Sequence, residues 1–271
     1  MRRIRIVVAY DGTNYCGWQI QPNGITIEEI LNRQISKLTG EDIRIIGASR
    51  TDSGVHALGN VAVFDTESRI PGDRFAYALN QKMPEDIVIV RSDEVQIDWH
   101  PRYQNEISKT YEYHIYNAKV RNPLKNRYST FVSFDLDVEK MRQGAKYILG
   151  EHDFASFCNV RTNAKDTVRT VHEITITEIP LDKFQASNWG QENSNLENEK
   201  EIVIRVTGNG FLYNMVRIIA GTLLGVGCGK IEPGAFRRAI ESGNRLDLGV
   251  TAPANGLTLM EVFYDPEDLK C

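Results

Sequence analysis

The sequence contains few of the patterns that hold metals or disulfides. Its five histidines lack the HExxH spacing, and its four cysteines are scattered without a CxxC pair (Cys16, Cys158, Cys228 and Cys271). Zinc sites and disulfide frameworks depend on such spacings. We therefore predict reduced thiols, a cytoplasmic location and no bound metal.

Long hydrophobic runs are also missing. The most apolar segment, residues 215–226, contains Arg217 and is shorter than the roughly 20 residues that cross a bilayer. The N-terminus begins Met-Arg-Arg and passes directly into an alternating pattern, without the apolar core of a signal peptide. We therefore expect neither a membrane span nor secretion.

The chain as a whole has no excess of positive charge, since its formal net charge is −4. The distribution is uneven, however, because residues 101–128 carry six cations (Arg102, Lys109, Lys119, Arg121, Lys125 and Arg127) against two acids. Phosphate binding depends on local positive charge more than on the total. This basic stretch is therefore a candidate surface for nucleic acid.

The most informative stretch is residues 47–57, Gly-Ala-Ser-Arg-Thr-Asp-Ser-Gly-Val-His-Ala, between apolar runs at 43–46 and 61–64 that we predict to be strands. Asp-Ser-Gly is a turn sequence, so a plain connection between strands is one interpretation. A cation, a carboxylate and an imidazole close together (Arg50, Asp52 and His56) favour a functional loop, because grouped charges cost desolvation energy.

Hydrophobic periodicity predicts an α+β fold. We expect two similar lobes, residues 1–105 and 106–271, with antiparallel sheets around a central cleft and helices on the outer side. The expected strands cover residues 2–10, 87–91, 109–117, 171–179, 201–207 and 258–264, and the expected helices cover 27–39, 75–81, 138–149, 215–226 and 233–243.

Two further residues are candidates for a site in the predicted cleft. Tyr111 lies on one face of the strand expected over 109–117, where tyrosine commonly has only a packing role. Arg217 interrupts an apolar helix. We expect a carboxylate opposite it, or else a side chain that extends to solvent.

Six ordered motifs resemble those of the A-type tRNA pseudouridine synthase family over nearly the whole chain. They lie at residues 10–19, 47–57, 109–113, 152–157, 211–217 and 252–257. The resemblance implies that uridine is isomerised to pseudouridine in the tRNA anticodon stem-loop, at nucleotides 38, 39 and 40. It further implies a homodimer that acts without a cofactor.

The resemblance also implies roles for individual residues. Asp52 matches the catalytic carboxylate, Tyr111 and Arg217 match the residues beside it, and Leu257 matches a wall of the pocket. Arg50 matches an arginine that fills the space left by the flipped base. The polar insertion at residues 188–200 is less typical of the family.

Two other functions are consistent with parts of the pattern. A glycoside or nucleoside hydrolase could use Asp52 as nucleophile, but such enzymes pair two carboxylates, and no second acid accompanies Asp52 in these motifs. An RNA-binding module could stack bases on Tyr111 and Tyr113. That interpretation leaves Asp52 and Arg217 unexplained.

Overall fold

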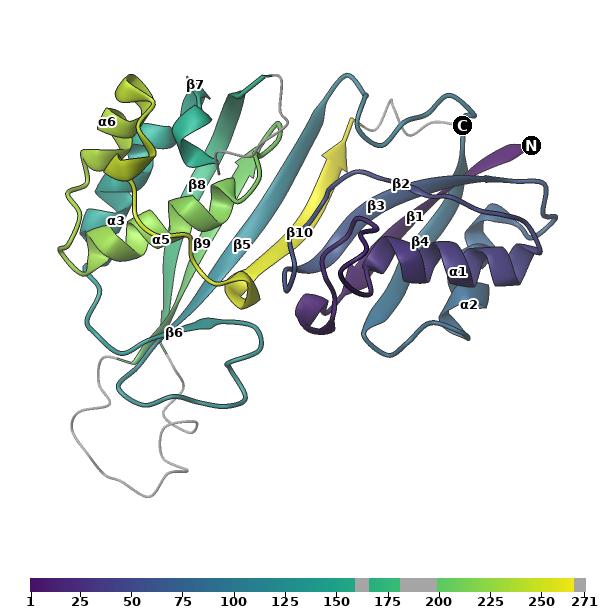
Figure 1. Cartoon of the computed structure of the whole chain (residues 1–271), viewed down its shortest axis with the longest axis horizontal. Coiled ribbons are helices and arrows are strands. Elements are labelled where there is room, and N and C mark those ends of the chain that lie inside the picture. The colour runs from purple at the N-terminus through teal and green to yellow at the C-terminus, as the bar shows by residue number, and fades with distance from the viewer. Residues whose placement is uncertain (159–165, 181–198, 266–271) are drawn as a thin grey trace. The chain divides into compact units, whose positions relative to one another are not determined.

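The computed structural model describes residues 1–158, 166–180 and 199–265 and has an α+β fold (Figure 1). Its contacts divide the chain into two compact units. Unit 1 comprises Met1–Thr110 and the chain from Thr258 onward, and unit 2 comprises Tyr111–Leu257. All but the last two residues of the polar insertion predicted at 188–200 lie outside the described residues.

Unit 1 is built on the strand order β4-β1-β3-β10, with the short β2 beside β3. Strand β1 lies antiparallel to β3 and β4, whereas β10 runs parallel to β3. The α+β fold class is confirmed, but the expectation of antiparallel sheets is wrong for the pair of β10 and β3, which is parallel. The strands are β1 (Arg2–Tyr10), β2 (Ile46–Gly47), β3 (His56–Thr66), β4 (Ile87–Val95) and β10 (Leu257–Tyr264).

The helices of unit 1 are α1 (Ile27–Thr39) and α2 (Phe75–Asn80), which pack against each other. Thr26 caps α1 by accepting a hydrogen bond from the Glu29 backbone, and Gly40 ends the helix with a left-handed φ of 76°. These are the boundaries that the sequence predicts, because both caps are local.

The strands around residues 47–57 differ from the prediction. Residues 43–45 form no strand, because the side chains of Ser36 and Asn32 on α1 accept hydrogen bonds from the backbones of Ile43 and Ile45 (both 2.9 Å). Strand β3 begins earlier than predicted, at His56, which lies opposite Thr258 of β10. The connecting loop is correspondingly shorter.

Unit 2 contains the strand order β5-β9-β8-β7, with β6 parallel to β5. Strand β8 is antiparallel to both of its neighbours, β7 and β9. The strands are β5 (Ile107–Asn117, which begins in unit 1), β6 (Thr130–Val132), β7 (Gly150–Asp153), β8 (Val168–Pro180) and β9 (Lys200–Gly208).

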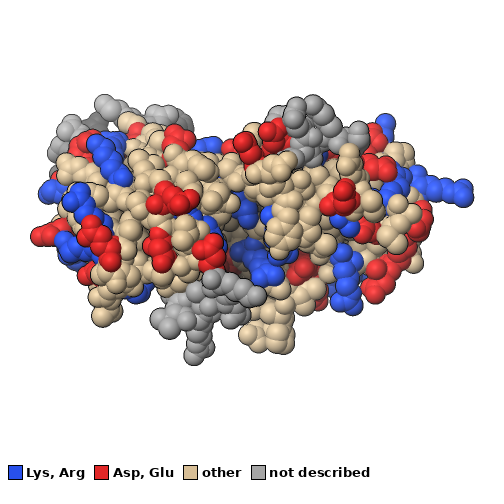
Figure 2. Space-filling view, turned by 90° about the horizontal axis from the view of Figure 1, so that it is seen from above, with Lys and Arg blue, Asp and Glu red and all other residues tan. Residues whose placement is uncertain are grey.

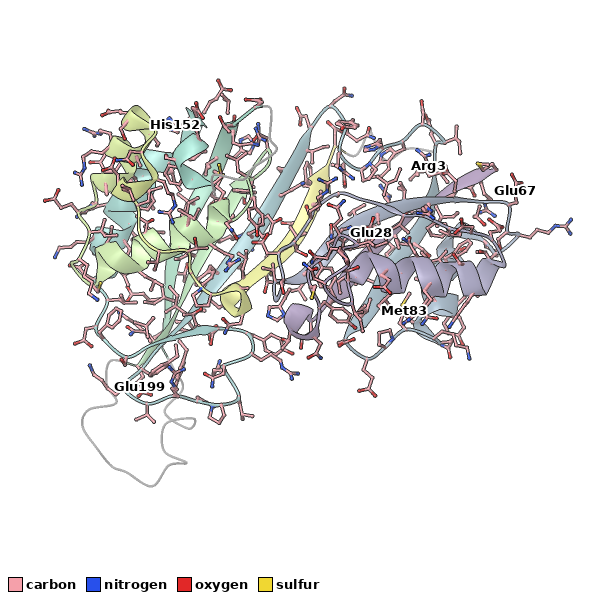
Figure 3. The ribbon with its side chains drawn as sticks, in the orientation of Figure 1. Arg3, Glu28, Glu67, Met83, His152 and Glu199 are labelled. Carbon is pink, nitrogen blue, oxygen red and sulfur yellow. The ribbon has the colours of Figure 1, made fainter. Side chains whose placement is uncertain are left out.

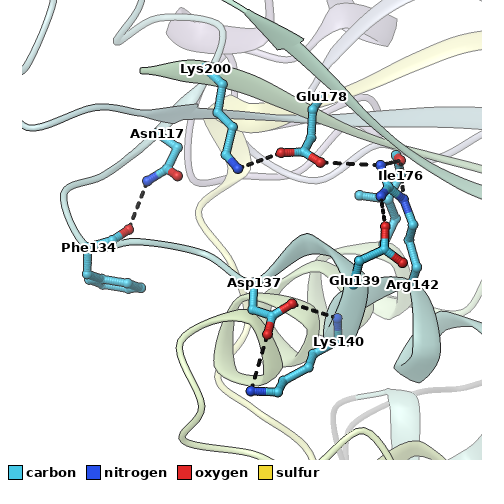
Figure 4. Close-up of polar contacts among 9 residues, drawn as sticks. All are labelled: Asn117, Phe134, Asp137, Glu139, Lys140, Arg142, Ile176, Glu178 and Lys200. Atoms are coloured by element: carbon cyan, nitrogen blue, oxygen red, sulfur yellow. Dashed lines mark hydrogen bonds and ion pairs between the residues drawn. The ribbon is translucent and has the colours of Figure 1, made fainter. Parts of the chain in front are cut away.

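The helices among the described residues of unit 2 are α3 (Val138–Ala145), α5 (Met215–Gly227) and α6 (Ala235–Ser242). Most residues of α5 are buried, and α5 packs against α3. Helix α3 is held to β8 by Arg142, whose Nε and Nη2 donate to the carbonyl oxygen of Ile176 (3.1 and 2.9 Å; Figure 4). It ends before the predicted residue 149, since a 3-10 turn and then β7 follow.

Charged side chains of both signs are interspersed on the face shown in Figure 2. Charged side chains also hold neighbouring strands together. Arg3 of β1 makes a bidentate pair with Asp65 of β3 (2.6 and 2.8 Å), and Arg3 is labelled in Figure 3. Among the described residues, no helix combines the length and apolarity needed to span a membrane.

Candidate active site

The loop between β2 and β3 carries two of the five predicted site residues. Arg50 is exposed, and Asp52 is half-buried. Asp52 begins a tight turn in which its carbonyl oxygen accepts a hydrogen bond from the Val55 backbone (3.1 Å) and Gly54 has a φ of 77°. The turn predicted from Asp-Ser-Gly is therefore confirmed.

This turn is attached to the earlier motif at residues 10–19. The backbone amide of Trp18 donates to the carbonyl oxygen of Thr51 (3.0 Å), and the hydroxyl of Ser53 donates to that of Tyr15 (3.2 Å). Asp52 thus lies between two residues whose positions are fixed from outside the loop. The two motifs form one structure within unit 1.

A buried amide on β3 holds the beginning of the loop. Asn60 is fully buried; its Nδ2 donates to the carbonyl oxygen of Ser49 (3.1 Å) and its Oδ1 accepts from the Ser49 backbone amide (3.3 Å). Asn60 is not among the predicted site residues. The feature of the sequence that could have indicated it is a side-chain amide inside the otherwise apolar run of this strand.

Two cations of the basic stretch also contact this loop. Arg102 Nε donates to the carbonyl oxygen of Gly47, and Lys109 Nζ donates to that of Ala48 (both 2.9 Å). Burial lowers the pKa of Arg102, and the nearby charge of Arg50 lowers it further. Arg50, Arg102 and Lys109 therefore place positive charge around the beginning of the loop that carries Asp52.

Tyr111 lies on β5 in unit 2 and is buried. Its ring meets that of Phe211 edge to face, with centroids 5.3 Å apart and an interplanar angle of 86°. Phe211 belongs to the motif that leads into α5. Tyr111 therefore has the packing contact expected of a strand tyrosine, and the predicted stacking on uracil stays a prediction.

Arg217 is positioned by the loop that precedes Leu257. Its Nε donates to the carbonyl oxygen of Ala252 (2.8 Å), and its Nη1 donates to Oδ1 of Asn214 (2.8 Å). The Ala252 amide returns a hydrogen bond to the Arg217 carbonyl (3.0 Å). Leu257, at the start of β10, is buried. Within unit 2, the structure thus connects Arg217 to the loop that carries Leu257.

The other cations of the basic stretch lie in unit 2, where several contact neighbouring side chains. Lys119 pairs with Asp135 (2.9 Å), and Lys125 pairs with Glu201 (3.2 Å). The Arg121 guanidinium lies over the ring of Phe131, 4.7 Å from its centroid. A stretch that is continuous in sequence is therefore divided between two units.

The predicted site residues divide in the same way. Arg50 and Asp52 belong to unit 1, whereas Tyr111, Arg217 and Leu257 belong to unit 2. The carboxylate partner expected for Arg217 stays a prediction, as does a site that combines both sets. No group of three or more His, Cys, Asp or Glu side chains among the described residues is arranged to hold a metal ion.

Comparison with known proteins identifies the family. The model of the tRNA pseudouridine synthase family matches residues 6–104 and 145–265, which include Arg50, Asp52, Arg217 and Leu257. The chain is 47% identical over 265 residues to tRNA pseudouridine synthase A of Acetivibrio thermocellus, covering 97% of this chain and 100% of that protein.

Two further relatives are similar over the same extent. The chain is 43% identical to tRNA pseudouridine synthase A of Thermoanaerobacter sp. (strain X514) and 45% identical to tRNA pseudouridine synthase A 2 of Clostridium perfringens. Each comparison covers 97% of this chain and 100% of the relative. The chain therefore belongs to the tRNA pseudouridine synthase family.

Proposed function

We propose that this chain isomerises uridine to pseudouridine in the anticodon stem-loop of tRNA, at nucleotides 38, 39 and 40, with Asp52 as the catalytic carboxylate. Family membership over nearly the full chain supports the reaction. The ordered motif at residues 47–57 supports the assignment of Asp52.

The proposed reaction is an isomerisation, so atoms and electrons balance without a co-reactant. The bond between uracil N1 and the ribose C1′ breaks, and a bond between uracil C5 and C1′ forms. The proton on C5 leaves, and N1 gains a proton. Such a reaction needs a carboxylate that attacks or stabilises the reacting centre, and a pocket that keeps the detached base from water.

The main structural support for Asp52 as the catalytic carboxylate is that hydrogen bonds from other parts of the chain hold the residues around it. Thr51 receives a backbone hydrogen bond from Trp18, Ser53 donates to Tyr15, and the fully buried Asn60 holds Ser49. A site held this firmly keeps its carboxylate in place without reorganisation during the reaction. A plain connection between strands does not need such support.

The other predicted residues have roles that their chemistry permits. In this proposal Tyr111 stacks on the uracil, Arg217 keeps the carboxylate ionised, and Leu257 closes the pocket. Arg50, which is exposed, occupies the space that the flipped nucleotide leaves. Cations of the stretch 101–128 contact tRNA phosphates and position the RNA.

Replacing Asp52 with Asn tests this proposal. We expect Asp52→Asn to abolish release of tritium from uracil C5 in unmodified tRNA, with tRNA affinity within a few-fold of wild type. The matched control is Asp42→Asn, an exposed acid in the same unit, which should retain wild-type activity. Chemical mapping of the modified nucleotide tests the anticodon positions.

Other results would favour a different function. A large loss of tRNA affinity in Asp52→Asn would contradict the catalytic assignment. Binding of tRNA without tritium release from wild type would support the RNA-binding module, and release of free uracil would support a hydrolase.

The homodimer and the cytoplasmic location belong to the same proposal. Sedimentation equilibrium of the full chain would test the dimer directly.

A further inference from the structure

The loop that precedes Leu257 is held at three points within unit 2. Ala252 pairs with Arg217 as described above, and the carbonyl oxygen of Pro253 accepts a hydrogen bond from the hydroxyl of Tyr113 (3.0 Å). The third point is Asn255. Its Nδ2 donates to two carbonyl oxygens, those of Asn126 (2.7 Å) and Ser129 (2.8 Å).

The carbonyls that Asn255 holds belong to a surface segment with a distinctive composition. This cationic segment, residues 119–129, includes four Lys and Arg residues together with the exposed side chains of Val120, Leu124 and Tyr128. Cations beside exposed apolar and aromatic groups are typical of surfaces that contact both the phosphates and the bases of RNA. The segment is therefore suited to the substrate of the proposed function.

The loop that carries Asn255 is tightly packed and has little freedom to move. A Cβ atom at the next residue, Gly256, would lie 2.8 Å from Cζ of Tyr113 and 3.0 Å from Oγ1 of Thr130. These two side chains also contact each other, with their oxygens 2.6 Å apart. Because the loop cannot shift easily, it is a rigid support from which Asn255 holds the cationic segment.

We propose that Asn255 is a positioning residue for the isomerisation. Its amide fixes the cationic segment, and the RNA bound to that segment, relative to Leu257 two residues later in the chain. The inference rests on the proposed function, because the position of the cationic segment matters for the reaction only if the segment binds the RNA substrate. Asn255 itself needs no contact with the reacting base.

The test uses Asn255→Asp, which keeps the size of the side chain but cannot donate and faces two carbonyl oxygens. The matched control is Asn122→Asp, within the cationic segment itself. Asn122 uses Oδ1 to accept from the Leu124 amide (3.0 Å), and aspartate keeps this acceptor. Asn122→Asp adds one negative charge within the segment, and Asn255→Asp adds one beside it, at the carbonyl oxygens of Asn126 and Ser129, so the control reports the effect of an added charge.

Two measurements are made on each full-length variant. The first is the single-turnover rate at saturating tRNA, together with the dissociation constant for tRNA. We expect both variants to weaken binding equally, whereas Asn255→Asp lowers the rate by at least about 10-fold relative to Asn122→Asp, as small misplacements in enzymes do. The second is the rate of trypsin cleavage after the Lys and Arg residues of the segment, which should rise only in Asn255→Asp.

The outcomes separate the two proposals. Equal single-turnover rates in the two variants would overturn the positioning role, even if Asn255→Asp unfolds at a lower temperature. Equal trypsin cleavage would overturn it as well, and this measurement does not depend on enzyme activity. A wild type that binds tRNA without isomerising it would contradict the proposed function, while the cleavage result would still stand. If Asn255→Asp does not fold, Asn255→Ser replaces it, and a wild-type rate in that variant overturns the role.

Discussion

The hydroxyl oxygen of Tyr10 lies 2.7 Å from the hydroxyl oxygen of Thr51, the residue immediately before Asp52. Both side chains are buried, and Nδ2 of Asn60 lies 3.4 Å from the Tyr10 hydroxyl. The first strand of the chain therefore supports the candidate catalytic loop through a side chain that is 41 residues away in sequence.

This contact predicts coupling between Tyr10 and Thr51. Each of Tyr10→Phe and Thr51→Val should lower the free energy of unfolding by about 1 kcal/mol, because each leaves a buried hydroxyl with fewer partners. The double variant should lose less than the sum, with a coupling of roughly 0.5–1.5 kcal/mol. Urea denaturation of the four proteins measures this, and strict additivity would contradict the coupling.

Gly17 is expected to tolerate no side chain. Its φ is 84°, and a Cβ atom there would lie 2.6 Å from the carbonyl oxygen of Thr51. Gly17→Ala should therefore displace Thr51 and reduce tritium release about 10-fold or more. Gly40→Ala is the matched control, since Gly40 has a φ of 76° with nothing within 4 Å of such an atom. The control should lose about 1 kcal/mol of stability and no activity. Equal activity in both variants would contradict the role of the clash.

Arg217 should not be replaceable by lysine. The Arg217→Lys variant keeps the charge but loses the fixed pair of hydrogen bonds to Ala252 and Asn214. We expect kcat to fall about 100-fold, with little change in tRNA affinity. The control is Arg238→Lys on α6, a half-exposed side chain paired with Glu232, which should keep wild-type kcat. A near-normal kcat in Arg217→Lys would show that charge alone is sufficient.

His114 should make the stability of unit 2 depend on pH. Burial lowers the pKa of His114, but hydrogen bonds to Glu201 and Glu112 and the charges of these residues outweigh burial, so its pKa is raised overall. Its contribution is therefore complete below about pH 6.5, the unfolded value, and is lost as pH rises through the higher folded pKa. The hydrogen bond from His114 holds the pKa of Glu201 at about 2, so the contribution of Glu201 is lost only as pH falls below about 4.5.

The measurement compares wild type with His114→Gln by urea denaturation. Wild type should be more stable by roughly 1–2 kcal/mol near pH 5.5, and the difference should shrink toward pH 9. His172→Gln, at an exposed position on β8, is the control for replacing a histidine with glutamine. A difference between wild type and His114→Gln that does not vary with pH would contradict the linkage.

Features that depend on a few neighbouring residues, and the family, could be predicted from the amino-acid sequence. The boundaries of α1 follow from Thr26 and Gly40, because a capping hydroxyl and a left-handed glycine act within one turn of the helix. The alternation of apolar residues in β1 likewise predicts its buried face, because neighbouring side chains of a strand point to opposite faces of the sheet. The six ordered motifs identify the family without any knowledge of the fold.

The distant residues that support the candidate site could be identified only from the folded chain. Asn60 holds Ser49, Tyr10 contacts Thr51, and Asn255 holds the carbonyls of the cationic segment. The pairing of β10 with β3, which places the last strand in unit 1, also joins residues that are far apart in the sequence. These contacts join side chains to each other or to backbone groups, or strand to strand, between separate parts of the chain. Their formation depends on how the whole chain packs, and no local pattern of residue types encodes that.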